Sequence, residues 1–287
     1  MNSFFRWLND RGIRDKLLIY ITIPVAVIIF FSFIGVSEKY RQYVNSKNTQ
    51  SFLTIVIALD NLIHELQKER GISAGIQNIK SNDFQEAISP QRLVTDQALQ
   101  NFLLQREKID IGFLSLEVRN QLSNLEGILK QLSTVRTEVD KHQSSDVVIK
   151  YSDINLNLIS FIQYLELMTT ENQLPELFHS YINLLWLQER AGQERASLVQ
   201  ILSSKYMHAD YYRRLLSYIE AQETLIRNYD IRTPLKYRQM LQEKLSDPFN
   251  GEVERYRDAT INKIIRNEFT RVSGKTGLCQ IRSTSAE

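Results

Sequence analysis

The chain has 287 residues, which is enough for one or two domains with a sizeable core. Glycine and proline are scarce, with 10 and 5 copies, and this favours an all-α protein. A formal charge of +2 argues against a nucleic-acid groove, and the single cysteine, Cys279, excludes an internal disulfide and a cysteine-based metal site.

The first predicted element is an uncharged segment at residues 17–36, LLIYITIPVAVIIFFSFIGV, long enough to cross a hydrocarbon core of about 30 Å. A cleaved signal peptide would have a shorter apolar region and a clearer cleavage site, so we expect a retained transmembrane helix. Basic residues are slightly more frequent before this segment than after it. That bias favours a cytoplasmic N-terminus at residues 1–16 and a periplasmic or extracellular location for the rest.

Downstream, apolar residues recur at helical spacing in several segments. The first seam contains Phe52, Val56, Leu59, Ile63 and Leu66, and others run through residues 118–139 and 147–165. Ser89-Pro90 and Pro175 each predict a helix start. We place the seam of the helix after Pro175 on positions 177, 181, 184, 188, 191, 195, 198 and 202. Further helices are expected at 211–226, 235–245 and 252–269, followed by a disordered tail at 273–287.

Two arginines fall on these apolar seams. Continuing the first seam places Arg70 on it, and the later seam contains Arg195. A buried charge without a partner costs several kcal/mol, so each guanidinium needs one. Either a glutamate from another helix pairs with it, or a small anion binds there. The candidate glutamates are Glu65, Glu69, Glu189 and Glu194.

Glycines accompany both arginines. Gly71, Gly75 and Gly192 each cost about 1 kcal/mol relative to alanine in a helix interior. Their small size would allow two helices to approach closely, or a small ligand to lie against the backbone. A planar guanidinium matches a planar oxyanion in a bidentate fashion, so a small oxyanion is the expected ligand.

Three segments resemble the signature of the nitrate- and nitrite-sensing (NIT) domain of bacterial transmembrane receptors. They are LIHELQKERGISAG (62–75), QRLVTDQAL (91–99) and LLWLQERAGQERASL (184–198), within a resemblance that covers about 53–271. The resemblance implies an extended helical sensor of two stacked four-helix bundles, expected here at 39–272. It also implies a ligand-binding set for nitrate or nitrite: Arg70, Arg195, Arg190, Arg92, Gly71 and Gly192. Arg92 has a second reading, as an i,i+4 ion pair with Asp96.

The resulting hypothesis is a membrane-anchored receptor of the bacterial inner membrane that binds nitrate or nitrite and relays a conformational signal. By analogy with receptors we expect a homodimer. No HAMP linker or output domain is recognisable, so we expect a receptor lacking its output domain or a sensor that acts through a separate output protein. No cofactor, metal site or catalytic residue is expected, because the four histidines are scattered and nucleophile motifs are absent. The alternative is a membrane-tethered helical bundle for interaction or dimerisation, with its arginines in structural ion pairs.

Overall fold

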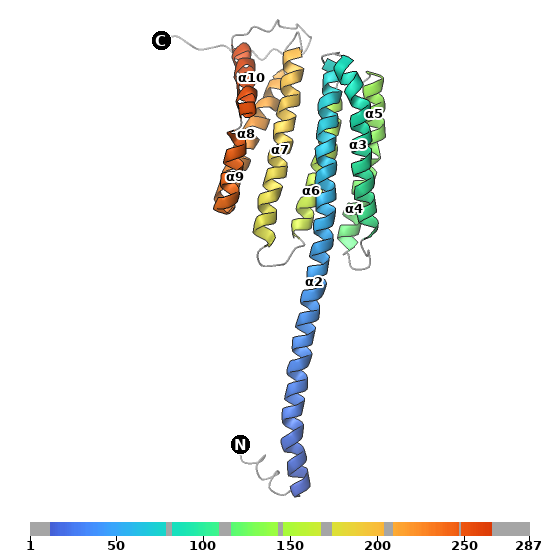
Figure 1. Cartoon of the computed structure of the whole chain (residues 1–287), viewed down its shortest axis with the longest axis vertical. Coiled ribbons are helices and arrows are strands. Elements are labelled where there is room, and N and C mark those ends of the chain that lie inside the picture. The colour runs from blue at the N-terminus through green and yellow to red at the C-terminus, as the bar shows by residue number, and fades with distance from the viewer. Residues whose placement is uncertain are drawn as a thin grey trace, which may run out of the picture. The chain divides into compact units, whose positions relative to one another are not determined.

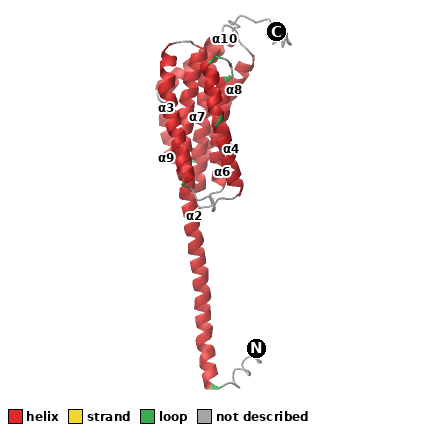
Figure 2. Ribbon diagram, turned by 90° about the vertical axis from the view of Figure 1, so that its right-hand side faces the viewer, coloured by secondary structure: helices red, strands yellow, loops and turns green. Residues whose placement is uncertain are grey.

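The computed structural model describes residues 12–78, 82–108, 116–142, 146–167, 174–203, 209–246 and 248–265. All regular structure in these ranges is helical, as Figure 2 shows, so the predicted all-α class is confirmed. Figure 1 labels the helices, which are α2 (Ile13–Asn78), α3 (Asn82–Glu107), α4 (Leu116–Leu129), α5 (Gln131–Asp140), α6 (Val147–Leu167), α7 (Leu174–Ser203), α8 (Ala209–Arg232), α9 (Leu235–Leu245) and α10 (Pro248–Ile265).

The chain divides into two compact units, residues 1–53 and 54–287. In the first unit, α2 contains the segment Ile21–Val44, which is long and apolar enough to cross a membrane, with a mean hydropathy of 2.1. Its apolar side chains are exposed rather than packed in a core. This segment overlaps the predicted span at 17–36. The segment is identified as a span by its length and composition alone, so membrane anchoring stays a prediction.

The second unit is a set of packed helices. The part of α2 from Thr54 onward forms side-chain hydrogen bonds with α3, α5 and α6, and α4 packs against α6. α4 and α5 follow one another with a break at Lys130. α7 packs against α6, α8 and α10. Side chains of α2 also bond directly to α7, for example Gln67 Nε2 to Glu189 Oε2 at 3.0 Å. α2, α6 and α7 therefore meet in the interior of this unit.

The predicted seams of three segments form the core. On α2 the seam positions Val56, Leu59, Ile63, Leu66, Arg70 and Ser73 are all buried. The seams at 118–139 and 147–165 are buried as well: Val118, Leu122, Leu125, Leu129, Leu132, Val139, Val147, Tyr151, Ile154, Leu158, Phe161 and Leu165. Strict helical spacing of apolar residues was sufficient to orient these helices.

Two details differ from the sequence prediction or lie outside the structure. α3 begins at Asn82, so Pro90 lies inside the helix and does not start one. Pro90 is exposed, where water can hydrogen-bond the carbonyl that loses its partner, so the helix tolerates it. The tail predicted to be disordered, 273–287, lies outside the described residues, as do residues 1–11 of the predicted cytoplasmic N-terminus.

Candidate functional site

Arg70 lies in the interior of the second unit, as predicted from the α2 seam. Only 1% of its surface is exposed. Its Nη1 atom forms an ion pair with Glu189 of α7 and donates a hydrogen bond to Ser152 Oγ of α6 at 2.9 Å. The expected interhelix ion pair is therefore present, and it fixes one edge of the guanidinium between α6 and α7.

The second terminal nitrogen of the same guanidinium, Nη2, takes no part in these contacts. Arg70 Nη2 is buried and has no hydrogen-bond partner among the described residues. It lies directly against the backbone of α7 at Gly192, where a Cβ would overlap Nη2 and come 3.7 Å from Cζ. Any residue larger than glycine at position 192 would displace the guanidinium. By contrast, a Cβ at Gly71 would meet nothing within 4 Å.

A cavity of about 330 Å³ opens beside this free edge. Arg70, Gly71 and Gly192 line it together with Arg195. The remaining lining residues are His64, Gln67, Lys68, Ala74, Gln188, Ala196 and Val199. Four residues of the predicted ligand set thus surround one space between α2 and α7, and a buried N–H donor without a partner lies at its wall.

The prediction that Arg195 lies on the buried seam of α7 is wrong, because Arg195 is exposed. The buried face of α7 instead contains Phe178, Ile182, Leu185, Glu189, Gln193 and Ala196. The helix is rotated relative to our prediction by about one residue, or 100°. Arg195 reaches the cavity from its rim, while Glu189 faces the core.

The sequence analysis named the two glutamates of α7 as possible partners of the arginines, but its seam did not place them in the interior, where both lie. Glu189 accepts hydrogen bonds from Gln67 of α2 and Asn155 of α6, in addition to its ion pair with Arg70. Glu194 is 1% exposed and forms a two-pronged pair with Arg257 of α10, at 2.6 and 2.9 Å. The repeated Glu-Arg pairs of α7 could have indicated them, had the seam been placed on the glutamates.

A second buried ion network lies next to Arg70 on α2. Glu69 is fully buried and receives two hydrogen bonds from Arg136 of α5, at 2.7 and 2.9 Å, and one from Tyr151 of α6 at 2.7 Å. Burial raises the pKa of Glu69, but the bonds from Arg136 and Tyr151 outweigh it, so the pKa lies below its ordinary value. Glu69 therefore ties α2 to α5 and α6, whereas Arg70 ties it to α6 and α7.

The structure does not bring Arg92 to the cavity. Arg92 pairs with Asp140 of α5 at 2.8 Å, whereas Asp96 pairs with Arg136 at 2.7 Å. The alternative prediction, an i,i+4 pair between Arg92 and Asp96, is wrong, because the two side chains have other partners. Asp96 thus has its partner on α5, and Arg92 has partners on α5 and, in Glu69 at 3.7 Å, on α2, which the local spacing could not reveal.

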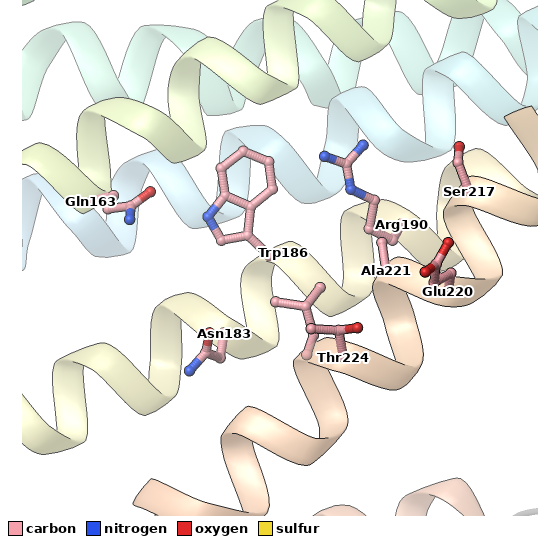
Figure 3. A pocket seen from close by; sticks show the side chains of 9 residues that line it. Gln163, Asn183, Trp186, Arg190, Ser217, Glu220, Ala221 and Thr224 are labelled. Carbon is pink, nitrogen blue, oxygen red and sulfur yellow. The ribbon is translucent and has the colours of Figure 1, made fainter.

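Arg190 likewise lies elsewhere. Figure 3 shows its guanidinium beside Trp186, in a groove between α7 and α8, and the distance from Cζ to the indole centroid is 5.5 Å. Arg190 Nη1 donates to Gln193 Oε1 at 2.8 Å. Such a cation–π contact contributes about 0.5–1 kcal/mol at a partly exposed site. It gives Arg190 a structural role on another face of α7.

Comparison with known proteins identifies the fold and the family of the chain. A solved structure, that of the NasR transcription antiterminator, has the same fold with a TM-score of 0.71 and 17% identity. The match covers 82% of this chain and 63% of that one, so the chain spans less than two thirds of its length. No curated protein matches the sequence. The family model for nitrate and nitrite sensing matches residues 61–283, and the chain therefore belongs to the nitrate- and nitrite-sensing (NIT) family.

Proposed function

We propose that nitrate or nitrite binds in the cavity between α2 and α7, held by Arg70 from the core and by Arg195 from the rim. The observation that carries this proposal is the buried Nη2 atom of Arg70, which has no partner among the described residues and lies beside the cavity. A buried donor without an acceptor is costly. An oxyanion in the cavity would supply the missing acceptor.

The chemistry of the cavity suits a small planar anion. A guanidinium presents its N–H groups in one plane, and nitrate presents oxygen atoms in one plane, so two parallel hydrogen bonds can form. Gly192 lets the Arg70 guanidinium reach this space, and Gly71 leaves the opposite wall open. Arg195 is exposed at the rim of the cavity and would close over the anion by adding a second set of charged donors.

Closure of this kind could carry a signal. An anion that contacts Arg70 of α2 and Arg195 of α7 favours the arrangement in which the two helices are held together, and it shifts the population toward that arrangement. α2 also contains the apolar segment Ile21–Val44, and we propose that it anchors the protein in the inner membrane. A homodimer and an output domain or separate output protein complete the hypothesis, by analogy with receptors.

The test is calorimetric titration of the purified chain in detergent with nitrate, nitrite and chloride at constant ionic strength. Saturable binding of nitrate or nitrite, with weaker binding of chloride, is expected. Replacement of exposed Arg195 by alanine should weaken that binding and leave the thermal unfolding midpoint nearly unchanged. If the chain binds none of the three anions, the proposal fails.

One observation favours a second candidate, a membrane-tethered bundle whose arginines serve only as structural ion pairs. Arg70 does form such a pair with Glu189. This candidate predicts no saturable anion binding, and a loss of stability as the only effect of replacing Arg70. The free Nη2 edge and the adjoining cavity favour the sensor, because a purely structural pair would not require them.

A further inference from the structure

We propose that Glu189 is a specificity-determining residue that restricts the cavity to anions of a single negative charge. The inference rests on the proposed function of the cavity and concerns which anions it admits. It starts from the position of Glu189, which pairs with Nη1 of Arg70, while Nη2 of the same guanidinium has no partner among the described residues and Arg70 lines the cavity.

The Glu189 carboxylate is held firmly in place. It is fully buried, and its two oxygens accept from Arg70 Nη1, from Gln67 Nε2 at 3.0 Å and from Asn155 Nδ2 at 3.3 Å. All three partners are donors, and they come from α2 and α6. The negative charge therefore stays behind Arg70 whichever anion enters the cavity.

The formal charge around the cavity then sums to one positive unit. The charge of Arg70 is balanced by Glu189, and Lys68 is balanced by Glu65 at 2.9 Å. Arg195 remains as the cation among the lining residues, with histidine counted as neutral. One negative charge on the ligand neutralises the site, whereas two would leave an excess negative charge in a partly enclosed space.

The size of the effect follows from Coulomb's law. Two groups bonded to different nitrogens of one guanidinium are separated by roughly 6 Å, and at an effective dielectric constant of about 20 a unit charge at that distance changes affinity by about a hundredfold. A dianion experiences this repulsion twice and a monoanion once. Glu189 should therefore disfavour a dianion relative to a monoanion of the same shape by about a hundredfold.

Perchlorate and sulfate test charge separately from shape, because both are tetrahedral and of similar size. Titration of the chain with nitrate, perchlorate and sulfate at constant ionic strength should show saturable binding of nitrate and perchlorate. Sulfate should bind far more weakly. If nitrate binds but perchlorate and sulfate are rejected alike, shape sets the specificity and this inference is overturned, while the proposed function stands. Failure of nitrate itself to bind refutes both.

The matched variants are Glu189→Gln and Glu194→Gln. Glu189→Gln should raise the affinity for sulfate relative to perchlorate by about a hundredfold, because the repulsion that acts twice on a dianion and once on a monoanion is removed. Glu194 is equally buried on the same helix but pairs with Arg257, so Glu194→Gln should leave that ratio unchanged. An unchanged ratio in a folded Glu189→Gln variant overturns the inference. If that variant does not fold, sulfate binding to the unmodified chain that is as tight as perchlorate binding overturns the inference.

Discussion

Replacing Gly192 by alanine separates anion binding from helix stability. The new methyl group would overlap Arg70 Nη2, so the guanidinium edge that faces the cavity must move by about 1 Å or more to restore van der Waals contact. Nη1 cannot follow freely, because Glu189 and Ser152 hold it. The substitution therefore acts on the donor that we assign to the anion.

The expected loss can be estimated from one charge-assisted hydrogen bond. Such a bond contributes about 1.5–3 kcal/mol, so nitrate affinity should fall by about tenfold to a hundredfold. Alanine also favours a helix over glycine by about 1 kcal/mol, which offsets part of the steric cost to folding. The free energy of unfolding should therefore change much less than the free energy of nitrate binding.

Gly127→Ala is the matched control. Gly127 is exposed and lies within α4, away from its first turn, and a Cβ there would meet nothing within 4 Å. It should gain up to about 1 kcal/mol of stability and bind nitrate as the parent does. Both variants are measured by calorimetric titration with nitrate and by thermal unfolding. A Gly192→Ala protein that binds nitrate as tightly as the parent would refute the assignment of Arg70 Nη2 to the anion.

Three further predictions concern the ion pairs. Arg195→Ala should lower nitrate affinity by at least tenfold in titration, while the free energy of unfolding stays within about 0.5 kcal/mol of the parent's because the side chain is exposed. Equal losses of binding free energy and of unfolding free energy would argue for a structural role. Arg257→Ala leaves buried Glu194 with Gln222 as its one hydrogen-bond partner among the described residues. It should lower the free energy of unfolding, measured by urea denaturation, by about 2 kcal/mol, and the folded protein should retain its nitrate affinity. Because the folded-state pKa of Glu69 lies below its ordinary value of 4.5, its contribution is fully present above that pH and is lost as the pH falls through the lower folded value. Glu69→Gln should therefore reduce the loss of stability between about pH 5 and pH 3, and identical pH profiles would contradict this.

The sequence was sufficient to orient α2 and insufficient to orient α7, for a physical reason. On α2 the apolar residues recur at a single phase, so continuing the seam correctly placed Arg70 in the core. On α7 four apolar residues stand in a row at 184–187, which is compatible with more than one phase. The Glu-Arg pairs add a second ambiguity, because the inward member depends on donors from other helices, here Arg70 for Glu189.

The same limit applies to the predicted ligand set. Arg70, Arg195, Gly71 and Gly192 line one cavity, while Arg190 faces another groove. Spacing along one helix shows which side chains share a face, but it does not show which face meets which neighbour. Long-range partners settle that question, and no single-helix pattern contains them.

The central claim is that Arg70 and Arg195 together hold the anion. The most direct measurement is an experimental structure of the chain with nitrate bound. We expect a planar anion in the cavity between α2 and α7, within hydrogen-bond distance of Arg70 Nη2 and the Arg195 guanidinium. An anion bound beside Arg190 or Arg92, with the space next to Arg70 filled only by water, would contradict it.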